Sequence, residues 1–366
     1  MNGKKGYLMA FKKIGVLTSG GDAPGMNACV KAVVNRAAEM GIEVVGIVGG
    51  YAGLINREFI PMTREMVNGA MTVGGTRLYS SRFPEFKQLE VRLQAVETCK
   101  QEGIEALICI GGDGTFQGAT EMTKLGIPSI GIPGTIDNDI TATDYTIGLD
   151  TSTNTTLRMI DNLKDTCESH ARLNVVEVMG RDCGQIALYA AIAGAAVAVA
   201  IPEIPFDEAA AIKKIAKLRE LGKRGMIVVV SEGVMNPDGT RYAEGFAKRI
   251  EEQTGVETKF ARFSHVVRGG RPTMRDRATA ASMSAKAVEL LAEGKSNVVM
   301  CELNGFIRPV DIHFALIADR MYKNKLKDGD LDGFTAEQLE GMKQLCDKRR
   351  EEIQNLYSVA KSVGYW

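Results

Sequence analysis

Histidine is scarce in this 366-residue chain, and there is no excess of charge of either sign. Both features exclude certain classes of protein function. The three histidines, His170, His265 and His313, are far apart in the sequence, and only His170 has a cysteine (Cys167) nearby, which argues against a zinc enzyme. Lys plus Arg and Asp plus Glu both number 45, so the formal net charge is zero. Proteins that coat nucleic acid or an anionic membrane need a broad basic excess, so we expect neither partner.

Paired cysteines and long apolar runs are also missing. The seven cysteines are an odd number without a CxxC pair, and most lie in apolar stretches such as 106–110, which is typical of a reduced protein. The longest apolar run, 192–201, is about half the length of a membrane helix. Residues 1–13 hold no apolar segment long enough for a signal peptide. We therefore predict a cytoplasmic protein.

The chain does contain β-branched runs that alternate with helical patterns and glycine turns. This alternation predicts right-handed βαβ units, and the length favours two domains. The predicted fold is α/β, with two Rossmann-like three-layer lobes, mostly parallel sheets and an active site in the cleft between them. The expected strands are 14–17, 44–48, 106–110, 127–132, 175–178, 226–230 and 297–301.

The lobes are expected to be discontinuous, because no Pro- or Ser-rich linker marks a clean boundary. We assign residues 1–148 plus about 267–325 to one lobe, and residues 149–266 plus about 326–366 to the other. The tail from residue 328 is charged and helical in pattern, and 343–352 is especially polar. We expect a solvated surface there.

Two glycine turns each follow a predicted strand and precede a predicted helix. In Thr18–Asn27 (TSGGDAPGMN), the glycines permit close backbone approach and the helix amides can bind an anion, although a purely steric need for glycine is an alternative. In Ile110–Thr115 (IGGDGT), Thr115 and the amides after it can cradle phosphate oxygens. Asp113 suits such a place chiefly if a divalent cation bridges it to phosphate. GGDG also occurs in lipid and dinucleotide kinases, so it indicates a nucleotide kinase without naming the acceptor.

A third segment, Pro133–Asp139 (PGTIDND), carries two carboxylates after a predicted strand. Phosphoryl transfer needs a base for the acceptor hydroxyl, and Asp137 is the candidate. Alone, the Asp-Asn-Asp sequence fits an Asx turn better. Its context shortly after GGDG favours catalysis.

Arginines next to glycine turns are candidate phosphate ligands, because a guanidinium can bind phosphate in a bidentate manner. Arg181 and Arg268 are the stronger candidates, since each adjoins a glycine at a strand end. Arg82 and Arg172 are weaker ones. His265 could bond a phosphate or a hydroxyl, or serve the structure.

Taken in order, these motifs resemble those of the 6-phosphofructokinases, specifically the ATP-dependent bacterial type. The match covers roughly residues 12–325 and includes Gly74–Thr76, Ser81–Phe86, Val175–Arg181 and Ala190–Gly194. The resemblance implies transfer of the ATP γ-phosphate to the C1 hydroxyl of fructose 6-phosphate, giving fructose 1,6-bisphosphate and ADP. It also implies Mg²⁺ as cofactor and a homo-oligomer, a tetramer or a dimer of dimers.

The resemblance also implies roles for individual residues. Asp137 would be the base, Arg181 would stabilise the transferring charge, and Asp113 would hold the metal. Arg172 would come from a neighbouring subunit. The ATP ligands would be Gly21, Arg82, Phe83, Asp113, Gly114, Thr115 and Gly118, with Arg92 where the family often has another nucleotide contact. The catalytic and sugar-phosphate residues would be Thr135, Asp137, Asp139, Arg172, Met179, Gly180, Arg181, Glu232, Lys259, His265 and Arg268.

The phosphoryl donor is argued from two small residues. Pyrophosphate-using relatives commonly carry Asp and Lys at the positions of Gly114 and Gly134, where the bulk would exclude a nucleotide. Both positions are glycine here and expected to be open, which favours ATP. The alternatives are a pyrophosphate-dependent kinase of the same fold and a non-catalytic nucleotide-binding regulatory subunit. The intact Asp113, Asp137 and Arg181 speak against the second.

Departures from the family pattern leave two points open, and the strictness for the acceptor is a third. The second intersubunit arginine falls on Lys259, so either Lys259 or Arg262 takes that role. Sedoheptulose 7-phosphate could react as well as fructose 6-phosphate. The positions that match a basic effector pocket read Lys31, Asn35, Arg64, Lys164, Val197, Lys223 and Arg224. Changes from the family pattern at Lys31, Asn35, Lys164 and Val197 predict a weak or altered response to ADP or phosphoenolpyruvate.

Overall fold

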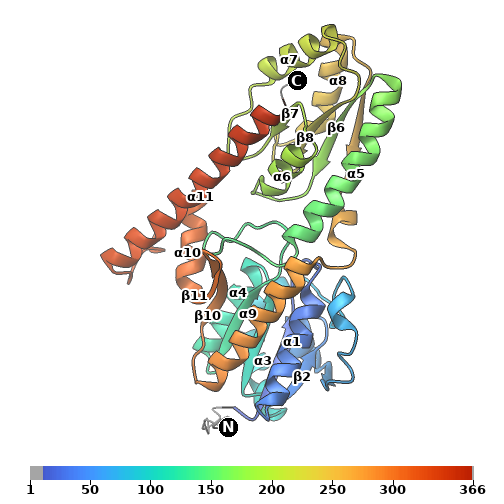
Figure 1. Ribbon diagram of the computed structural model, residues 1–366. Helices are drawn as coiled ribbons and strands as arrows, with labels where there is room; N and C mark the ends of the chain where they lie inside the picture. The colour runs from blue at the N-terminus through green and yellow to red at the C-terminus, as the bar shows by residue number, and fades with distance from the viewer. Residues whose placement is uncertain (1–10, 365–366) are drawn as a thin grey trace. The chain divides into compact units, whose positions relative to one another are not determined.

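The computed structural model describes residues 11–364, and this part of the chain divides into two compact units (Figure 1). Unit 1 comprises the described part of Met1–Ile136, together with Ile140–Gly148 and Arg268–Leu345. Unit 2 comprises Asp137–Asp139, Leu149–Val267 and the described part of Cys346–Trp366. The sequence assigned residues 326–345 to the other lobe; the contacts group them with unit 1, so that assignment was wrong.

Unit 1 is built on a seven-stranded sheet with the order β11-β10-β5-β4-β1-β2-β3. The inner strands pair in parallel, whereas the edge strands β3 and β11 pair antiparallel with β2 and β10. Sequence patterns missed both edge strands, because β3 has only three residues and β11 is largely exposed. The strands are β1 (Lys13–Thr18), β2 (Glu43–Ile47), β3 (Phe59–Pro61), β4 (Ala106–Gly111), β5 (Ser129–Pro133), β10 (Val298–Leu303) and β11 (Phe306–Asp311).

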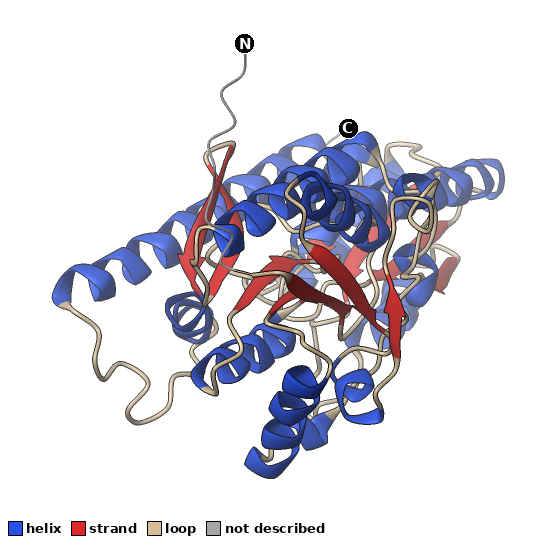
Figure 2. Ribbon diagram, turned by 90° about the horizontal axis from the view of Figure 1, so that it is seen from below, coloured by secondary structure: helices blue, strands red, loops and turns tan. Residues whose placement is uncertain are grey.

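Helices cover both faces of this sheet, which makes unit 1 a three-layer structure (Figure 2). On one face, α2, α3, α4 and α10 share a buried core with the strands; on the other, α1 and α9 pack against the sheet and each other. Asp311 caps α10 by accepting a hydrogen bond from the Phe314 amide at 2.8 Å. The helices are α1 (Met26–Glu39), α2 (Tyr51–Asn56), α3 (Leu89–Gln101), α4 (Asp113–Lys124), α9 (Met274–Ala292) and α10 (Ile312–Tyr322), with short 3₁₀ helices η1 (Ala70–Thr72) and η2 (Pro84–Lys87).

Unit 2 is built on a four-stranded, fully parallel sheet with the order β7-β8-β6-β9. Its central strands β6 and β8 are buried along their whole length, as expected for a parallel sheet covered on both faces. Helices α7 and α8 share one core with the strands, and α5 and α6 contact them separately. The elements are α5 (Leu149–His170), β6 (Leu173–Val178), α6 (Gln185–Ala193), β7 (Ala198–Ala200), α7 (Glu208–Glu220), β8 (Met226–Ser231), α8 (Tyr242–Thr254) and β9 (Thr258–Arg262). The 3₁₀ helix η3 (His265–Arg268) follows, and its last residue, Arg268, belongs to unit 1.

The prediction of an α/β fold with two three-layer lobes and mostly parallel sheets is confirmed. The run 192–201 is the end of α6 followed by β7, as its short length suggested. No helix within residues 11–364 combines the length and the apolar character that crossing a bilayer requires. All seven cysteines are free and buried, and burial raises the thiol pKa of Cys29, Cys99 and Cys109 to about 12.

The C-terminal helix α11 (Ala336–Val363) departs from the sequence prediction at one position. Lys343 and Lys348 are exposed, as the polar pattern predicts. Arg349, however, has only 5% of its surface exposed and lies on the buried side together with Cys346 and Ile353. The expectation of a fully solvated surface over 343–352 was therefore wrong for this arginine.

Candidate functional site

The three motifs come together at one edge of the unit 1 sheet. Strands β5, β4 and β1 are neighbours and run parallel, so their carboxyl ends lie side by side. Thr18–Asn27 follows β1, Gly112–Thr115 follows β4, and Gly134 onward follows β5. Ligands of open parallel sheets bind at such carboxyl ends.

The first two turns are locked to one another by two hydrogen bonds. The Ser19 amide donates to the Ile110 carbonyl at 3.0 Å, and the Thr115 hydroxyl donates to the Ser19 carbonyl at 3.1 Å. A Cβ on Gly111 would lie 2.3 Å from Thr115 Oγ1 and 2.4 Å from the Ser19 carbonyl oxygen. Glycine is therefore required at residue 111 for the two turns to approach.

A positive charge lies against the first turn. Gly20 adopts a φ of +87°, which favours glycine, and an added Cβ on Gly21 would lie 3.0 Å from Nη1 of Arg268. The same Nη1 donates to the Asp22 carbonyl at 3.1 Å. Arg268, which the resemblance assigns to the sugar phosphate, thus lies in unit 1 beside Gly21, a predicted ATP ligand.

The second turn leads directly into α4, whose first residue is Asp113. An added Cβ at Gly112 or Gly114 would meet no atom within 4 Å, so space beside this helix N-terminus is open. Helix N-termini attract anions through unpaired amides and the helix dipole. Within the described residues no cluster of three or more His, Cys, Asp or Glu could hold a metal. One carboxylate beside an anion-binding turn still fits Mg²⁺, which commonly takes one or two carboxylates and completes its shell with phosphates and water.

Other predicted ATP ligands have varied surroundings. An added Cβ on Gly118 would lie 2.5 Å from the Tyr51 ring, so packing alone accounts for this glycine. Arg82 is exposed, and Phe83 packs partly against the unit 1 core. Arg92 is held by Glu121 of α4 in an ion pair of 2.5 Å.

The third motif begins in unit 1 and ends in unit 2. The Gly134 amide donates to the Gly111 carbonyl at 3.0 Å, and the Thr146 hydroxyl donates to the Thr135 carbonyl at 2.6 Å. An added Cβ on Gly134 would lie 3.0 Å from Cγ2 of Ile110, so this position is packed. The expectation that Gly134 is open was wrong, whereas Gly114 is open.

Asp137, Asn138 and Asp139 form a buried acidic turn, with at most 8% of any residue exposed. Asn138 has a φ of +49°, in the left-handed region that Asn tolerates better than most residues. Nη1 of Arg181 pairs with Oδ2 of Asp139 at 3.3 Å, and the arginine side chain is 53% exposed. A predicted catalytic acid and the predicted charge-stabilising arginine are thereby brought together.

Unit 2 presents a second set of residues at strand ends. The loop after β6 is held by Glu232, which accepts hydrogen bonds from the Gly180 and Arg181 amides at 3.2 and 3.1 Å. Gly180 has a φ of +145°, and an added Cβ would lie 2.4 Å from the Cys183 carbonyl oxygen. Met179 is buried next to this loop. These predicted sugar-site residues follow the adjacent strands β6 and β8.

Two other predicted phosphate ligands lie elsewhere in unit 2. Arg172 precedes β6 and Lys259 is the second residue of β9, so both are at the amino ends of their strands. Both pair with Glu257, at 2.7 Å for Arg172 and 3.0 Å for Lys259. These two cations lower the pKa of the Glu257 carboxyl. Because β6 separates this group from Met179–Arg181, the chain does not bring all its predicted sugar-phosphate ligands together.

Lys259 and Arg262, the two candidates for the second intersubunit contact, pair with different carboxylates. Arg262 ends β9 and its Nε donates to the buried Glu177 at 2.7 Å, away from Glu257. Lys259 is therefore the residue grouped with Arg172. His265 is exposed, and its Nδ1 lies 3.1 Å from the hydroxyl of Ser264.

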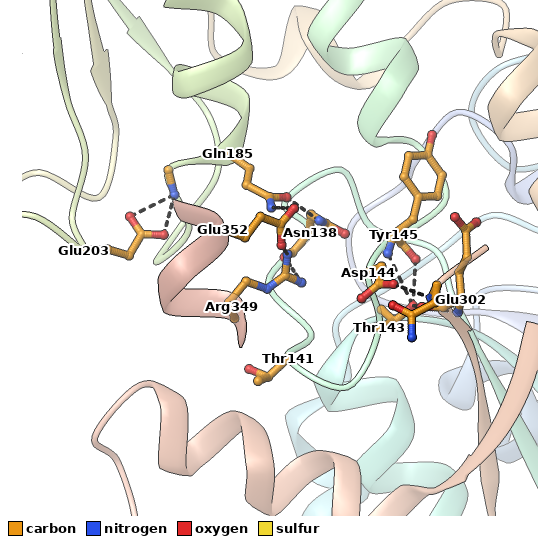
Figure 3. Close-up of polar contacts among 12 residues, drawn as sticks. Asn138, Thr141, Thr143, Asp144, Tyr145, Gln185, Glu203, Glu302, Arg349 and Glu352 are labelled. Carbon is orange, nitrogen blue, oxygen red and sulfur yellow. Dashed lines mark hydrogen bonds and ion pairs between the residues drawn. The ribbon is translucent and has the colours of Figure 1, made fainter. Parts of the chain in front are cut away.

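Sequence patterns missed a polar network, buried except at Glu352, around the third motif (Figure 3). Its members Gln185, Arg349 and Glu352 contact Asn138 or one another in unit 2. They come from α6 and α11, distant in sequence from the motif, and no local spacing marks them.

Sequence patterns also missed a second group of polar residues. This group fixes Ile140–Gly148, the segment after the third motif, within unit 1. Asp276 of α9 is fully buried and accepts hydrogen bonds from the Tyr145 hydroxyl at 2.5 Å and the Gly148 amide at 2.7 Å. The Thr143 hydroxyl accepts one from the Glu302 amide at 2.9 Å (Figure 3). Asp276 could have been noticed only as an acidic residue in the first turn of a helix.

Two α/β units with mostly parallel sheets, with glycine turns and acidic and basic loops at their strand ends, define a phosphate-handling α/β protein. The sequence profile of the family described as Phosphofructokinase matches residues 13–291, so the chain belongs to the phosphofructokinase family. The resemblance drawn from the motifs is confirmed.

Named relatives and a solved structure agree with this membership. The chain is 50% identical over 316 residues to ATP-dependent 6-phosphofructokinase 1 of Clostridium perfringens, covering 86% of this chain and 97% of that protein. It is 47% identical over 318 residues to the ATP-dependent 6-phosphofructokinase of Clostridium acetobutylicum, covering 87% and 98%. The structure of phosphofructokinase from Saccharomyces cerevisiae matches with a TM-score of 0.79 and 31% identity over 88% of this chain. This chain spans 47% of the length of the yeast one.

Proposed function

We propose that this protein is an ATP-dependent 6-phosphofructokinase that transfers the γ-phosphate of ATP to the C1 hydroxyl of fructose 6-phosphate. The observation that carries the proposal is the convergence of the three motifs at the ends of β1, β4 and β5. Glycine turns for phosphate and an acidic turn for the acceptor thereby follow neighbouring strands. The names of the Clostridium relatives support ATP as the donor.

The proposed nucleotide ligands are on unit 1. Gly21, Gly114, Thr115 and the amides that open α4 would bind phosphate oxygens. Gly114 lies beside open space at the helix N-terminus, and Arg268 places positive charge beside Gly21. Arg82, Phe83 and Gly118 are proposed as further ATP contacts. For Gly118 this is the weakest assignment, because Tyr51 already accounts for the missing side chain.

Magnesium is the proposed cofactor, and Asp113 is the residue that would hold it. When bound, magnesium would neutralise charge on the phosphates during transfer. Asp113 contributes its carboxylate from the first turn of α4, so its backbone position is fixed by the helix.

In the proposed reaction Asp137 accepts the proton from the C1 hydroxyl as the oxygen–phosphorus bond forms and the bond to the β-phosphate oxygen breaks. Thr135 and Asp139 flank this base, and the ion pair of Asp139 with Arg181 keeps a guanidinium next to the acidic turn. Arg181 would stabilise charge on the transferring group. Oriented positioning and electrostatics supply most of the rate acceleration in such transfers.

The proposed sugar-phosphate ligands are divided. Met179, Gly180, Arg181, Glu232, His265 and Arg268 would bind the substrate within one subunit. Arg172 and Lys259, paired with the same carboxylate at the opposite strand ends, would serve the site of a neighbouring subunit in a homo-oligomer. Their separation from Met179–Arg181 supports this division.

A coupled assay that crosses two donors with two acceptors tests the proposal. The purified protein should turn over with ATP and fructose 6-phosphate, and much more slowly when pyrophosphate replaces ATP. Faster turnover with pyrophosphate would overturn the donor. A preference for sedoheptulose 7-phosphate would overturn the acceptor, and no turnover with any pair would favour a regulatory subunit.

A further inference from the structure

A charged side chain is buried in α11, where the helix packs in unit 2. Arg349 is 5% exposed, while its neighbour Arg350 is exposed. Burying a guanidinium is unfavourable unless charged or hydrogen-bonding partners compensate. The surroundings of Arg349 show what it holds in place.

Arg349 and Glu352 belong to a chain of polar contacts that ends at the acidic turn (Figure 3). Nη1 of Arg349 donates to Oε2 of Glu352 at 3.3 Å, and Nη2 donates to the Asn138 carbonyl at 3.5 Å. Oε1 of Glu352 accepts from Nε2 of Gln185 at 3.1 Å. Oε1 of Gln185 in turn accepts from Nδ2 of Asn138.

The order of donors and acceptors in this chain has a structural consequence. An ionised carboxylate only accepts hydrogen bonds, so Glu352 requires that Gln185 present its NH₂ group toward α11. The Gln185 oxygen is then directed to the Asn138 amide. Asn138 is held on its side chain by Gln185 and on its carbonyl by Arg349, in the left-handed conformation that few residues adopt unaided.

Asn138 lies between the proposed base Asp137 and the arginine-paired Asp139. Its backbone angles therefore set the direction in which both carboxylates leave the chain. We propose that Arg349 and Glu352 of the C-terminal helix are positioning residues for the Asp137 and Asp139 carboxylates. The inference rests on the proposed function, and α11 lies beyond residue 291, where the family match ends.

Two variants and two matched controls test this role. Glu352→Ala and Arg349→Met should each lower kcat by about 10- to 100-fold, since a displacement of about 1 Å at a reacting group has effects of that order. The KM for ATP should stay within about twofold, because the proposed ATP ligands belong to unit 1 and this network belongs to unit 2. The control Arg350→Met removes the exposed neighbouring arginine, which pairs with Asp347, and should leave kcat unchanged.

The control Ile353→Ala separates positioning from stability. Ile353 is buried on the same helix, one turn after Arg349, and its truncation should lower the unfolding temperature while kcat of the folded enzyme is retained. Glu352→Gln keeps an acceptor oxygen for Gln185 and should recover most of the activity lost in Glu352→Ala. Unchanged kcat in both main variants, or an equal kcat loss in Ile353→Ala, would overturn the proposal.

Hydrogen–deuterium exchange gives a readout that does not depend on turnover. Peptides that cover residues 134–142 should exchange faster in Glu352→Ala and Arg349→Met than in wild type, and at the wild-type rate in Arg350→Met. If the wild-type protein fails to phosphorylate fructose 6-phosphate, the proposed function is wrong, yet the exchange still decides whether α11 holds the acidic turn. Equal exchange in all variants would refute the positioning role.

Discussion

The two units present functional groups at their strand ends in different ways. Unit 1 uses backbone: its turns after β1, β4 and β5 are rich in glycine, and Gly111 and Gly20 are needed for steric or conformational reasons. Unit 2 uses charged side chains: Arg181 pairs with Asp139, Glu232 accepts two loop amides, and Arg172 and Lys259 share Glu257.

We propose that this difference separates phosphate binding from the chemistry of transfer. Backbone amides at a helix N-terminus suit phosphate oxygens, because they offer fixed donors without a bulky side chain. Side chains can accept a proton, and they can also follow charge that develops during the reaction. Backbone amides cannot do both. Substitutions in unit 2 should therefore change turnover and sugar-phosphate affinity. Substitutions in the unit 1 turns should mainly disturb the packing of those turns.

The largest expected effect is at the acidic turn. Asp137→Ser should lower kcat by about a thousandfold while the KM for fructose 6-phosphate changes little, because a general base contributes about 10²- to 10⁴-fold. Steady-state kinetics measures both values, with the exposed Asp165→Ser as control. An unchanged turnover number would remove Asp137 from the mechanism and, with it, the assignment of chemistry to unit 2.

The next largest effect is expected at Arg172 and Lys259, the basic pair around Glu257. Arg172→Ala should raise the KM for fructose 6-phosphate by about 10- to 100-fold, since hydrogen bonds to charged groups contribute about 1.5–3 kcal/mol. The KM for ATP should stay the same. Lys259→Arg should lower the sugar-phosphate KM, because Arg can bind phosphate in a bidentate manner.

Kinetics with both substrates varied tests this pair. Lys248→Ala, which removes an exposed lysine of α8 paired with Glu244, is the control. If Arg172→Ala leaves the sugar-phosphate KM at the wild-type value, side chains at these strand ends do not bind substrate.

A smaller effect, on stability, is expected at the glycine turns of unit 1. Gly111→Ala should lower the free energy of unfolding by about 1–3 kcal/mol, because its Cβ would collide with Thr115 and Ser19. Gly112→Ala should cost about 0.5 kcal/mol or less, because its Cβ meets open space. Urea denaturation measures both. Similar costs for the two substitutions would show that the turns are not closely packed.

The smallest effect concerns Glu203, which accepts hydrogen bonds from the Gly184 amide at 2.9 and 3.1 Å. Burial raises the pKa of this carboxyl above its usual value, so the folded state holds the proton more tightly than the unfolded state. Its stabilising contribution is full below the unfolded pKa and is lost as pH rises through the folded pKa.

Glu203→Gln removes this titration. The free energy of unfolding of the variant, relative to wild type, should therefore increase from acidic toward neutral pH. Urea denaturation across this range measures the difference. A constant difference would show that Glu203 does not titrate with folding.

Much of the site was predictable because it is local in sequence. A glycine or acidic motif directly after an apolar run stays at the end of that strand in the folded chain, so Thr18–Asn27, Gly111–Thr115 and Pro133–Asp139 appeared where expected. The fold class followed from the same alternation of strands and helices. The edge strands were missed because short or exposed strands leave little apolar pattern.

The rest depended on contacts between residues far apart in the chain. Gly134 was expected to be open but meets Ile110, and Gly118 was assigned to a ligand but packs against Tyr51. Composition around a glycine does not show which side chain fills the space beside it, since that neighbour comes from another element.

The sequence alone therefore determined the family, the α/β class and the turns that follow β1, β4 and β5, because each depends on short-range spacing. Only the tertiary structure decided that Lys259 joins Arg172 at Glu257 and that Arg349 is buried against Asn138. The polar segment 343–352 looks solvated by composition. A helix has two sides, however, and packing alone selects which of its charges leaves water.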